Sequence, residues 1–372
     1  MLDVFKKWYE RYLFQEEAVL LLVLLTLAIV LLMTLGDVLA PVLASIVLAY
    51  LMEGLASQLE SRGLPQWFGI GFSFLVFIGA FFGFCLGLLP LAWQQLVSLA
   101  AEMPRMLERG RELLSVLPEQ YPDLVSHSQL NELLGLAQTE IAGAGQSLLS
   151  YSVSSIPSVL ALIVYMVLIP ILVFFFLKDR QKILDWLAGF LPRERPLLRQ
   201  IWVEMDVQVA NYARGKALEM LIVGSVSYVS FVSLGLNYAA LLALLVGLSV
   251  IVPYIGAALV TLPVVMVAFF QWGFTNEFYY VFGVYALIQA LDGNVLVPLL
   301  FSEAVNLHPV AIILAVLFFG GIWGLWGVFF AIPLATLIKA IIYAWPTPEP
   351  EKNTSSRIGS SAKAEQPSST TE

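Results

Sequence analysis

Residues 278–301 read FYYVFGVYALIQALDGNVLVPLLF, an apolar run that is interrupted by the polar sequence Gln289-Ala-Leu-Asp292-Gly293-Asn294. A carboxylate in the middle of a membrane span costs about 2.5–3.5 kcal/mol on insertion scales, because lipid cannot solvate its charge. Such side chains usually face the interior of a helix bundle or a water-filled cavity, and they are functional candidates by default. Asp292 is therefore the first candidate functional residue, provided that the run lies in a membrane.

The composition indicates that a membrane is the right setting. Hydrophobic residues make up 59% of the 372 residues and charged residues only 12%, and the mean hydropathy is +0.85. Soluble domains are about 45–50% apolar and about 25% charged. A soluble fold of this length has no room to bury so much apolar surface, so the sequence predicts an all-α, polytopic membrane protein in contact with the lipid bilayer. One cysteine and two histidines leave little material for a disulfide or a metal site, and no cofactor is expected.

About eight spans follow from the distribution of apolar residues, since one span needs about 20 of them. The predicted spans are residues 18–35, 38–52, 68–93, 156–177, 217–236, 238–272, 278–301 and 309–343. A tight turn is expected at Gly36-Asp37, between the first two spans. The chain then divides into three N-terminal spans in 1–93, an external helical segment in 94–155, a fourth span with an amphipathic segment in 156–216, a C-terminal core in 217–345 and a disordered tail in 346–372.

Charged residues in the loops predict the orientation, because Lys and Arg favour cytoplasmic loops. Residues 178–216 contain eight Lys or Arg, whereas residues 94–155 contain three, against seven Asp or Glu. The first segment is therefore predicted to be cytoplasmic and the second external. Eight crossings that begin after the basic N-terminus place both termini in the cytoplasm.

Two predicted spans are too long for a simple crossing. Residues 238–272 and 309–343 would each extend about 52 Å as a straight helix, against a hydrocarbon core of about 30 Å. Each carries helix breakers near its middle, namely Pro253-Tyr-Ile-Gly256 and Gly320-Gly321-Ile-Trp-Gly324. The sequence therefore predicts broken or re-entrant segments in the C-terminal third, with a tilted and kinked helix as the alternative. A full hairpin would change the number of crossings.

Asp292 has two polar neighbours that extend the candidate site. Gln289 lies one turn before it on the same helix face, and Asn294 can face the same cavity only if Gly293 breaks or bends the helix. Together these side chains can bind a proton or a cation. The alternative is an interhelical hydrogen bond that only fixes packing.

Further ionisable residues lie on both sides of this span. Lys216 and Glu219 are spaced to form an ion pair near the start of the fifth span, where a structural role is favoured over a role in transport. Glu303 and His308 follow the span and are candidates for a gate or a proton relay, since His titrates near neutral pH. The favoured alternative for both is an interfacial loop whose polar residues meet water.

Several sequence motifs resemble those of the autoinducer-2 exporter family, and in particular of its PerM-type permeases from gram-negative bacteria. The motifs are Val252-Pro-Tyr-Ile-Gly256, Leu291-Asp-Gly-Asn-Val-Leu-Val-Pro298, Asn306-Leu-His-Pro309, Phe319-Gly-Gly-Ile-Trp-Gly-Leu-Trp-Gly327 and Ala331-Ile-Pro-Leu-Ala-Thr-Leu-Ile-Lys339. The resemblance covers roughly residues 1–346. It implies a transporter of the inner membrane. Some family members are associated with export of autoinducer-2 and others with sodium/proton exchange, so the family name does not fix the substrate.

The expected function is that of an inner-membrane secondary transporter, a permease or exporter of a small solute such as a signalling molecule, with its site in the transport core 217–345. An ion gradient or the gradient of the solute itself would drive it. The alternatives are a sodium/proton antiporter, a channel-like exporter and a membrane scaffold protein. The sequence contains no phosphate-binding loop, nucleophile elbow or zinc-protease motif, so we expect neither an enzyme nor a partner nucleic acid. Regularly spaced leucines in 94–117 suggest contact with neighbouring helices or with another subunit of a homo-oligomer.

Overall fold

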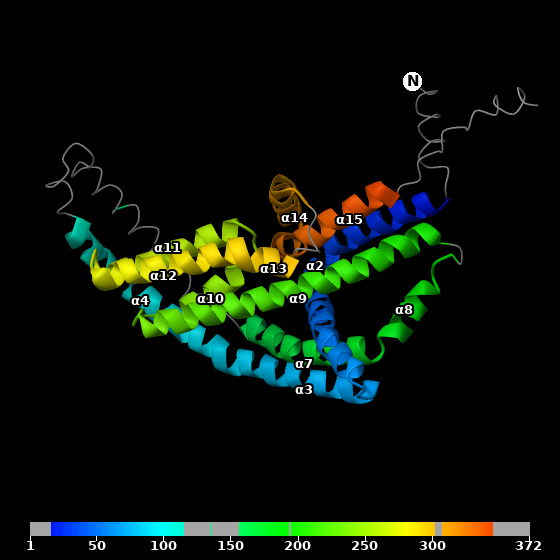
Figure 1. Ribbon diagram of the computed structural model, residues 1–372, viewed down its shortest axis with the longest axis horizontal. Coiled ribbons are helices and arrows are strands. Elements are labelled where there is room, and N and C mark those ends of the chain that lie inside the picture. The colour runs from blue at the N-terminus through cyan, green and yellow to red at the C-terminus, as the bar shows by residue number, and fades with distance from the viewer. Residues whose placement is uncertain (1–15, 115–134, 136–155, 193–194, 302–306, 345–372) are drawn as a thin grey trace, which may run out of the picture.

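The computed structural model describes residues 16–114, 135, 156–192, 195–301 and 307–344, and within these residues it contains helices and no strands (Figure 1). Seven helices of the described chain are long and apolar enough to cross a membrane. The number rises to eight if the bent pair Leu162–Lys178 and Arg180–Ala188 is counted as one span. The predicted all-α, multi-pass architecture of about eight spans is confirmed.

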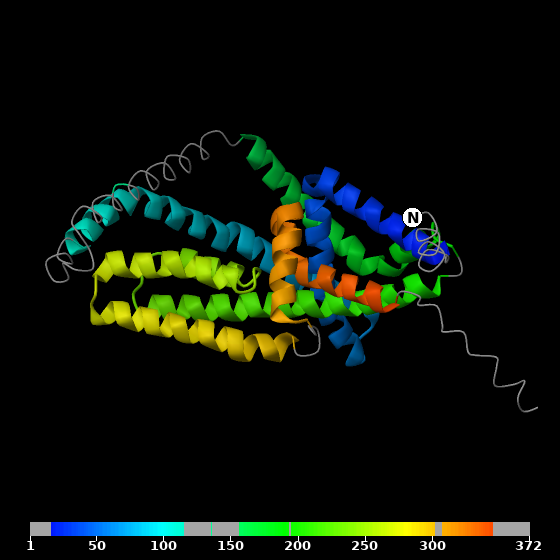
Figure 2. The same cartoon turned by 90° about the horizontal axis from the view of Figure 1, so that it is seen from above.

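The first helix, α2 (Glu16–Ser61), contains two of these apolar stretches, Val19–Gly36 and Val38–Ser61. The expected tight turn at Gly36-Asp37 is wrong, because the backbone is helical through both residues. The ribbon instead changes direction along α2, which carries Pro41 inside the helix (Figures 1 and 2). The glycine serves close packing, since a Cβ at Gly36 would lie 3.0 Å from Nε1 of Trp323.

The next helices form a long rod and a bent pair. The rod consists of α3 (Gln66–Gly83), the π-helix η1 (Phe84–Leu88) and α4 (Leu89–Leu114), with no interruption. The predicted end of the third span at residue 93 therefore lies inside a helix. After the rod come α7 (Ile156–Lys178) and α8 (Arg180–Ala188), whose axes differ by 79°.

The C-terminal part begins with α9 (Pro196–Ser233), which joins the predicted amphipathic segment and the predicted fifth span in one helix. The domain boundary proposed at residue 216 therefore falls inside α9, where the buried Lys216 has partners within the protein. The remaining elements are α10 (Ala239–Ser249), α11 (Ile255–Trp272), α12 (Asn276–Leu291), the π-helix η2 (Asp292–Leu296), α13 (Val297–Phe301), α14 (Pro309–Phe329) and α15 (Ala331–Ala344).

Helix α9 is the central column of the molecule. It contacts α2, α10, α12, α13 and α15 (Figures 1 and 2). One buried cluster joins α9 to α4, α10, α11 and α12, and a second joins it to α13, α14 and α15. A third cluster lies between α2, α3 and α7. The two broken segments of the C-terminal third are therefore both attached to α9.

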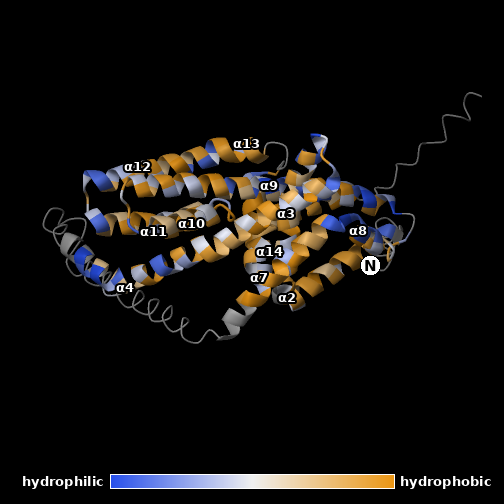
Figure 3. Cartoon of the chain, turned by 90° about the horizontal axis from the view of Figure 1, so that it is seen from below, coloured by the Kyte–Doolittle hydropathy of each residue, from blue (hydrophilic) through white to orange (hydrophobic). Residues whose placement is uncertain are grey.

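Hydrophobic residues make up most of the helices (Figure 3), and many of them are exposed. Large side chains such as Val38, Leu75 and Leu299 are about 70% exposed. Soluble proteins rarely expose contiguous apolar patches of this kind. The exposed side chains therefore face lipid, and the protein is a multi-pass membrane protein.

Candidate functional site

The first broken segment is a hairpin made of α10 and α11. Residues seven positions apart lie about 10 Å apart in a straight helix, yet a Cβ at Gly256 would lie 1.8 Å from the carbonyl oxygen of Ser249. At the open end, the Gln271 side chain donates a hydrogen bond to the Gly235 carbonyl and accepts one from the backbone N–H of Asn237, both at 2.9 Å. The hairpin therefore enters and leaves at the same end of the molecule, and its reversal at residues 250–254 lies where Pro253 and Gly256 predicted it.

The second broken segment folds back within α14. Gly324 has φ 58° and ψ −136°, a conformation that an L side chain rarely adopts. A Cβ at Gly327 would lie 1.9 Å from the Phe319 carbonyl oxygen, whereas a straight helix would separate these residues by about 12 Å. The reversal lies inside the glycine-rich stretch that begins at Gly320 and Gly321.

Helix α9 bonds to the hairpin reversal and to the end of α14 through two side chains one turn apart. The Lys216 ammonium donates a hydrogen bond of 2.7 Å to the carbonyl of Val250, where α10 ends. The Tyr212 hydroxyl donates one of 2.9 Å to the carbonyl of Phe329, where α14 ends. A helix end leaves carbonyl groups without an intrahelical partner, and such groups must find one at membrane depth. Side chains of α9 satisfy one such carbonyl at the end of α10 and one at the end of α14.

Lys216 also forms a buried ion pair with Glu219. Its Nζ lies 2.8 Å from a carboxylate oxygen of Glu219, and the two side chains are only 5% and 2% exposed. The ammonium lies 5.3 Å from the centre of the Phe301 ring on α13. The pair expected from the sequence is therefore present, and Lys216 contacts both the hairpin and α13.

Asp292 completes a group of three charges. It interacts electrostatically with both Lys216 and Glu219. Its Oδ1 atom is buried and has no hydrogen-bond partner among the described residues. Two carboxylates and one ammonium carry a net charge of −1 when all three are ionised, and we use "charge triad" for Lys216, Glu219 and Asp292. The group can accept a proton or a small cation.

The π-helix η2 begins at Asp292 and contains the predicted irregularity at Gly293. A π-turn places an extra residue in the helical turn, and such turns are frequent at functional sites. The helix is thus distorted at Gly293 but remains continuous into α13. The distortion occurs where α12 and α13 pass α9, which brings a residue of another span to the Lys216–Glu219 pair.

The two amides predicted to join Asp292 have other partners. Gln289 donates a hydrogen bond of 3.0 Å to the Tyr285 hydroxyl, which lies 2.9 Å from the hydroxyl of Thr261 on α11. Asn294 is exposed and donates to the Ala290 carbonyl at 2.8 Å. Tyr285 therefore links α12 to the hairpin, whereas Gln289 and Asn294 each bond within their own helical segment.

The candidate residues that follow α13 have other surroundings. His308 is exposed and caps α14, since its Nδ1 accepts a hydrogen bond of 3.2 Å from the Val310 amide. This contact fits the interpretation of His308 as an interfacial residue. Glu303 and Asn306 lie outside the described residues. In the described part of the chain, no group of three His, Cys, Asp or Glu side chains is arranged to hold a metal ion.

Tyr212 is the site residue that sequence reasoning missed. It is 3% exposed and contacts the rings of Phe301 and Phe329. Its spacing of four residues from Lys216 places both side chains on one face of α9. That spacing was readable in the sequence, but the backbone carbonyls that the two side chains bind were not.

Comparison with known proteins decides the family. A model described as "AI-2E family transporter" matches residues 19–347. This chain belongs to the AI-2E transporter family. The protein "Putative permease PerM" of Escherichia coli (strain K12) is 47% identical over 346 residues, which cover 93% of this chain and 98% of PerM. "Putative transport protein YrrI" of Bacillus subtilis (strain 168) is 27% identical over 306 residues, which cover 81% of this chain and 85% of YrrI. The resemblance predicted from the sequence motifs is confirmed, and these AI-2E relatives are named as permeases or transport proteins rather than as enzymes.

Proposed function

We propose that this AI-2E family protein is an ion-coupled secondary transporter of a small solute, and that the charge triad is its coupling site. The observation that carries the proposal is the buried Oδ1 of Asp292, which has no hydrogen-bond partner among the described residues, on a carboxylate that interacts electrostatically with the buried Lys216–Glu219 pair. Removing an uncompensated charge from water is costly, so the site gains free energy when a proton or a cation neutralises it. Intramembrane ionisable residues of this kind mark ion pathways in transporters.

The attachment of the triad to the hairpin gives a route from ion binding to movement. Lys216 divides its hydrogen bonds between Glu219 and the Val250 carbonyl at the hairpin reversal. A cation that binds the carboxylates competes with the ammonium for them, which changes how strongly Lys216 holds the hairpin. Binding sites formed by broken helices near the membrane midplane are typical of secondary transporters.

The proposal includes a location and a direction. The excess of Lys and Arg in residues 178–216 supports a cytoplasmic position for α8 in an inner membrane. The family resemblance supports outward movement of the solute. A sodium/proton antiporter is the second candidate, because the net charge of −1 in the triad suits exchange of one cation for another without an organic solute.

Purified protein in liposomes tests the coupling. Sodium or proton gradients are imposed, and the internal pH is followed with a trapped dye while a panel of small metabolites is screened for movement. We expect the Asp292→Asn variant to insert and fold, since the amide keeps the shape of the side chain, but to lose the response to the gradients. Glu277→Gln is the matched control, because Glu277 is an exposed acid on the same helix. If Asp292→Asn responds like the wild type at every pH, Asp292 is not the coupling residue. Ion movement without any solute would favour the antiporter.

A further inference from the structure

A pocket lies at the bend between α7 and α8, and none of its lining residues belongs to the charge triad. The axis of α8 is turned by 79° from that of α7. If α7 crosses the membrane, α8 runs close to the membrane plane. The aromatic side chains of Trp186, Phe190 and Trp202 are exposed in this region. Trp residues concentrate at the membrane–water interface, so this bend lies at the depth of the lipid head groups.

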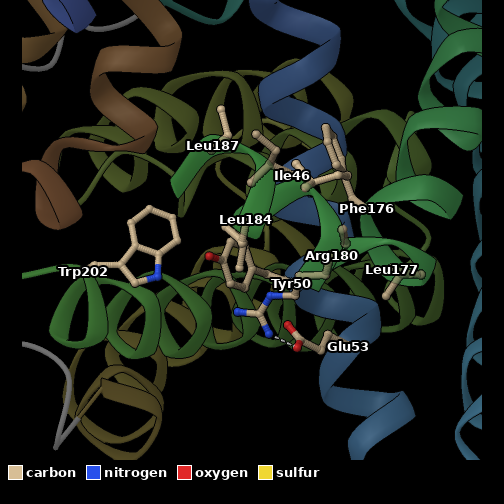
Figure 4. A pocket seen from close by; sticks show the side chains of 11 residues that line it. Ile46, Tyr50, Glu53, Phe176, Leu177, Arg180, Leu184, Leu187 and Trp202 are labelled. Atoms are coloured by element: carbon tan, nitrogen blue, oxygen red, sulfur yellow. Dashed lines mark hydrogen bonds and ion pairs between the residues drawn. The ribbon is translucent and has the colours of Figure 1, made fainter. Parts of the chain in front are cut away.

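The pocket has a volume of about 210 Å³ and is enclosed by α2, α7, α8 and α9 (Figure 4). Most of its wall is apolar and includes Ile46, Phe176, Leu184 and Trp202. An apolar pocket at head-group depth suits an acyl chain, because its wall offers the chain the van der Waals contacts that it would otherwise make with other lipid chains.

One end of the pocket carries charge. The Arg180 guanidinium pairs with Glu53 of α2 and donates bonds of 2.7 and 2.9 Å to the two carboxylate oxygens of Asp206 on α9. The Tyr50 hydroxyl donates a further bond of 2.6 Å to Asp206. Two carboxylates and one guanidinium leave a net charge of −1. The side chains of Arg180 and Glu53 are 35% and 36% exposed, so both retain surface for a ligand.

We propose that this pocket binds a zwitterionic phospholipid whose head group carries a primary ammonium. Its acyl chain lies against the apolar wall, its ammonium meets Glu53, and its phosphate lies beside Arg180. The net charge of −1 disfavours an anionic lipid at the same position, because like charges repel in a poorly screened setting. A choline head group has the same charge as the proposed ligand but no N–H group, so it cannot donate a hydrogen bond to Glu53.

The test compares lipids that differ only in the head group. The full-length protein is purified in mild detergent and mixed with phosphatidylethanolamine, phosphatidylcholine or phosphatidylglycerol of identical acyl chains, and retained lipid is counted by native mass spectrometry. We expect retention of phosphatidylethanolamine to exceed that of the other two by about tenfold, which corresponds to one charge-assisted hydrogen bond of about 1.4 kcal/mol or more.

Two variants and one control assign the binding to this pocket. Glu53→Gln should remove the preference for phosphatidylethanolamine, and Leu184→Trp should reduce retention of all three lipids by filling the apolar part. Glu60→Gln, which alters an exposed acid further along α2, should behave like the wild type. Equal retention of the three lipids by the wild type overturns the proposal. An unchanged preference in Glu53→Gln also overturns it. A dimer of the chain that carries no lipid in any of the three mixtures overturns it as well.

Discussion

Lys216 is held in the membrane interior by two oxygens, the carboxylate of Glu219 and the carbonyl of Val250. Replacing it with methionine leaves a buried carboxylate without its counter-charge and a buried carbonyl without its donor. Removing one partner of a buried pair typically costs about 3–5 kcal/mol. We therefore expect Lys216→Met to lower the thermal unfolding midpoint strongly in detergent.

The double variant separates the charge effect from a packing effect. In Lys216→Met/Glu219→Met the buried Glu219 carboxylate that lost its counter-charge is removed as well, so the unfolding midpoint should lie above that of Lys216→Met alone, while Asp292 is retained in both variants. Lys182→Met is the control, because Lys182 pairs with Asp179 on an exposed surface where ion pairs stabilise little. A double variant that is less stable than Lys216→Met would show that the pair contributes through packing instead of charge.

Substitution of Tyr212 should weaken the contact of α9 with the end of α14 and leave its contact with the hairpin intact. Tyr212→Phe keeps the ring contacts and removes only the hydrogen bond to the Phe329 carbonyl, a loss of about 1 kcal/mol. Amide hydrogen exchange should become faster around residues 326–334, while residues 250–256 exchange as in the wild type. Faster exchange at both reversals would mean that the two broken segments open together and not separately.

At the scale of the elements, the two reversals depend on backbone approaches that leave no space for a side chain. We expect Gly256→Ala and Gly327→Ala each to reduce the yield of monodisperse protein severely, because the new methyl group would overlap the carbonyl of Ser249 or of Phe319. Gly71→Ala and Gly283→Ala are matched controls. Neither would meet a neighbour within 4 Å, and alanine favours a helix over glycine by up to about 1 kcal/mol. Normal yields of Gly256→Ala or Gly327→Ala would contradict these reversals.

The elements also show what could be predicted from sequence and why. Apolar run length identified the regions of the long apolar helices, because hydrocarbon thickness sets a minimum length that composition reveals directly. Breakers identified both reversals, since Pro253 and Gly324 disfavour a continuous helix. The turn at Gly36-Asp37 was not found in the structure. The close approach of Trp323 to Gly36 is a long-range contact, and local sequence does not encode such pairs.

The sequence predicted which charged residues belong to the candidate site, but not how they contact one another. The sequence singled out Asp292, Glu219 and Lys216 because each is a charge in or beside an apolar run. It paired Asp292 with Gln289 by helical spacing, whereas the structure pairs it electrostatically with α9 and ties Gln289 to Tyr285. Helical periodicity predicts neighbours on one helix, but the relative rotation of two helices depends on their packing.

At the scale of the whole molecule, the hairpin decides which loops share a side of the membrane. A simple crossing of residues 238–272 would place residue 237 and residue 274 on opposite sides. The structure instead bonds Gln271 to both Gly235 and Asn237, so the two ends of the hairpin lie together. The same end includes Tyr238, whose hydroxyl is bonded to Glu102 of α4.

Single cysteines test this topology in a Cys85→Ala background. Asn237→Cys and Phe274→Cys should react with a membrane-impermeant thiol reagent from the same side, and Leu187→Cys on α8 only from the other side. Phe274 and Leu187 are both exposed, so access does not limit the reaction. With α8 in the cytoplasm, intact cells should label positions 237 and 274, and inverted vesicles should label position 187. Labelling of 237 and 274 from opposite sides would mean that residues 238–272 cross the membrane once. The reversal at Val250 would then lie inside a kinked span, and Lys216 would no longer hold the tip of a re-entrant hairpin.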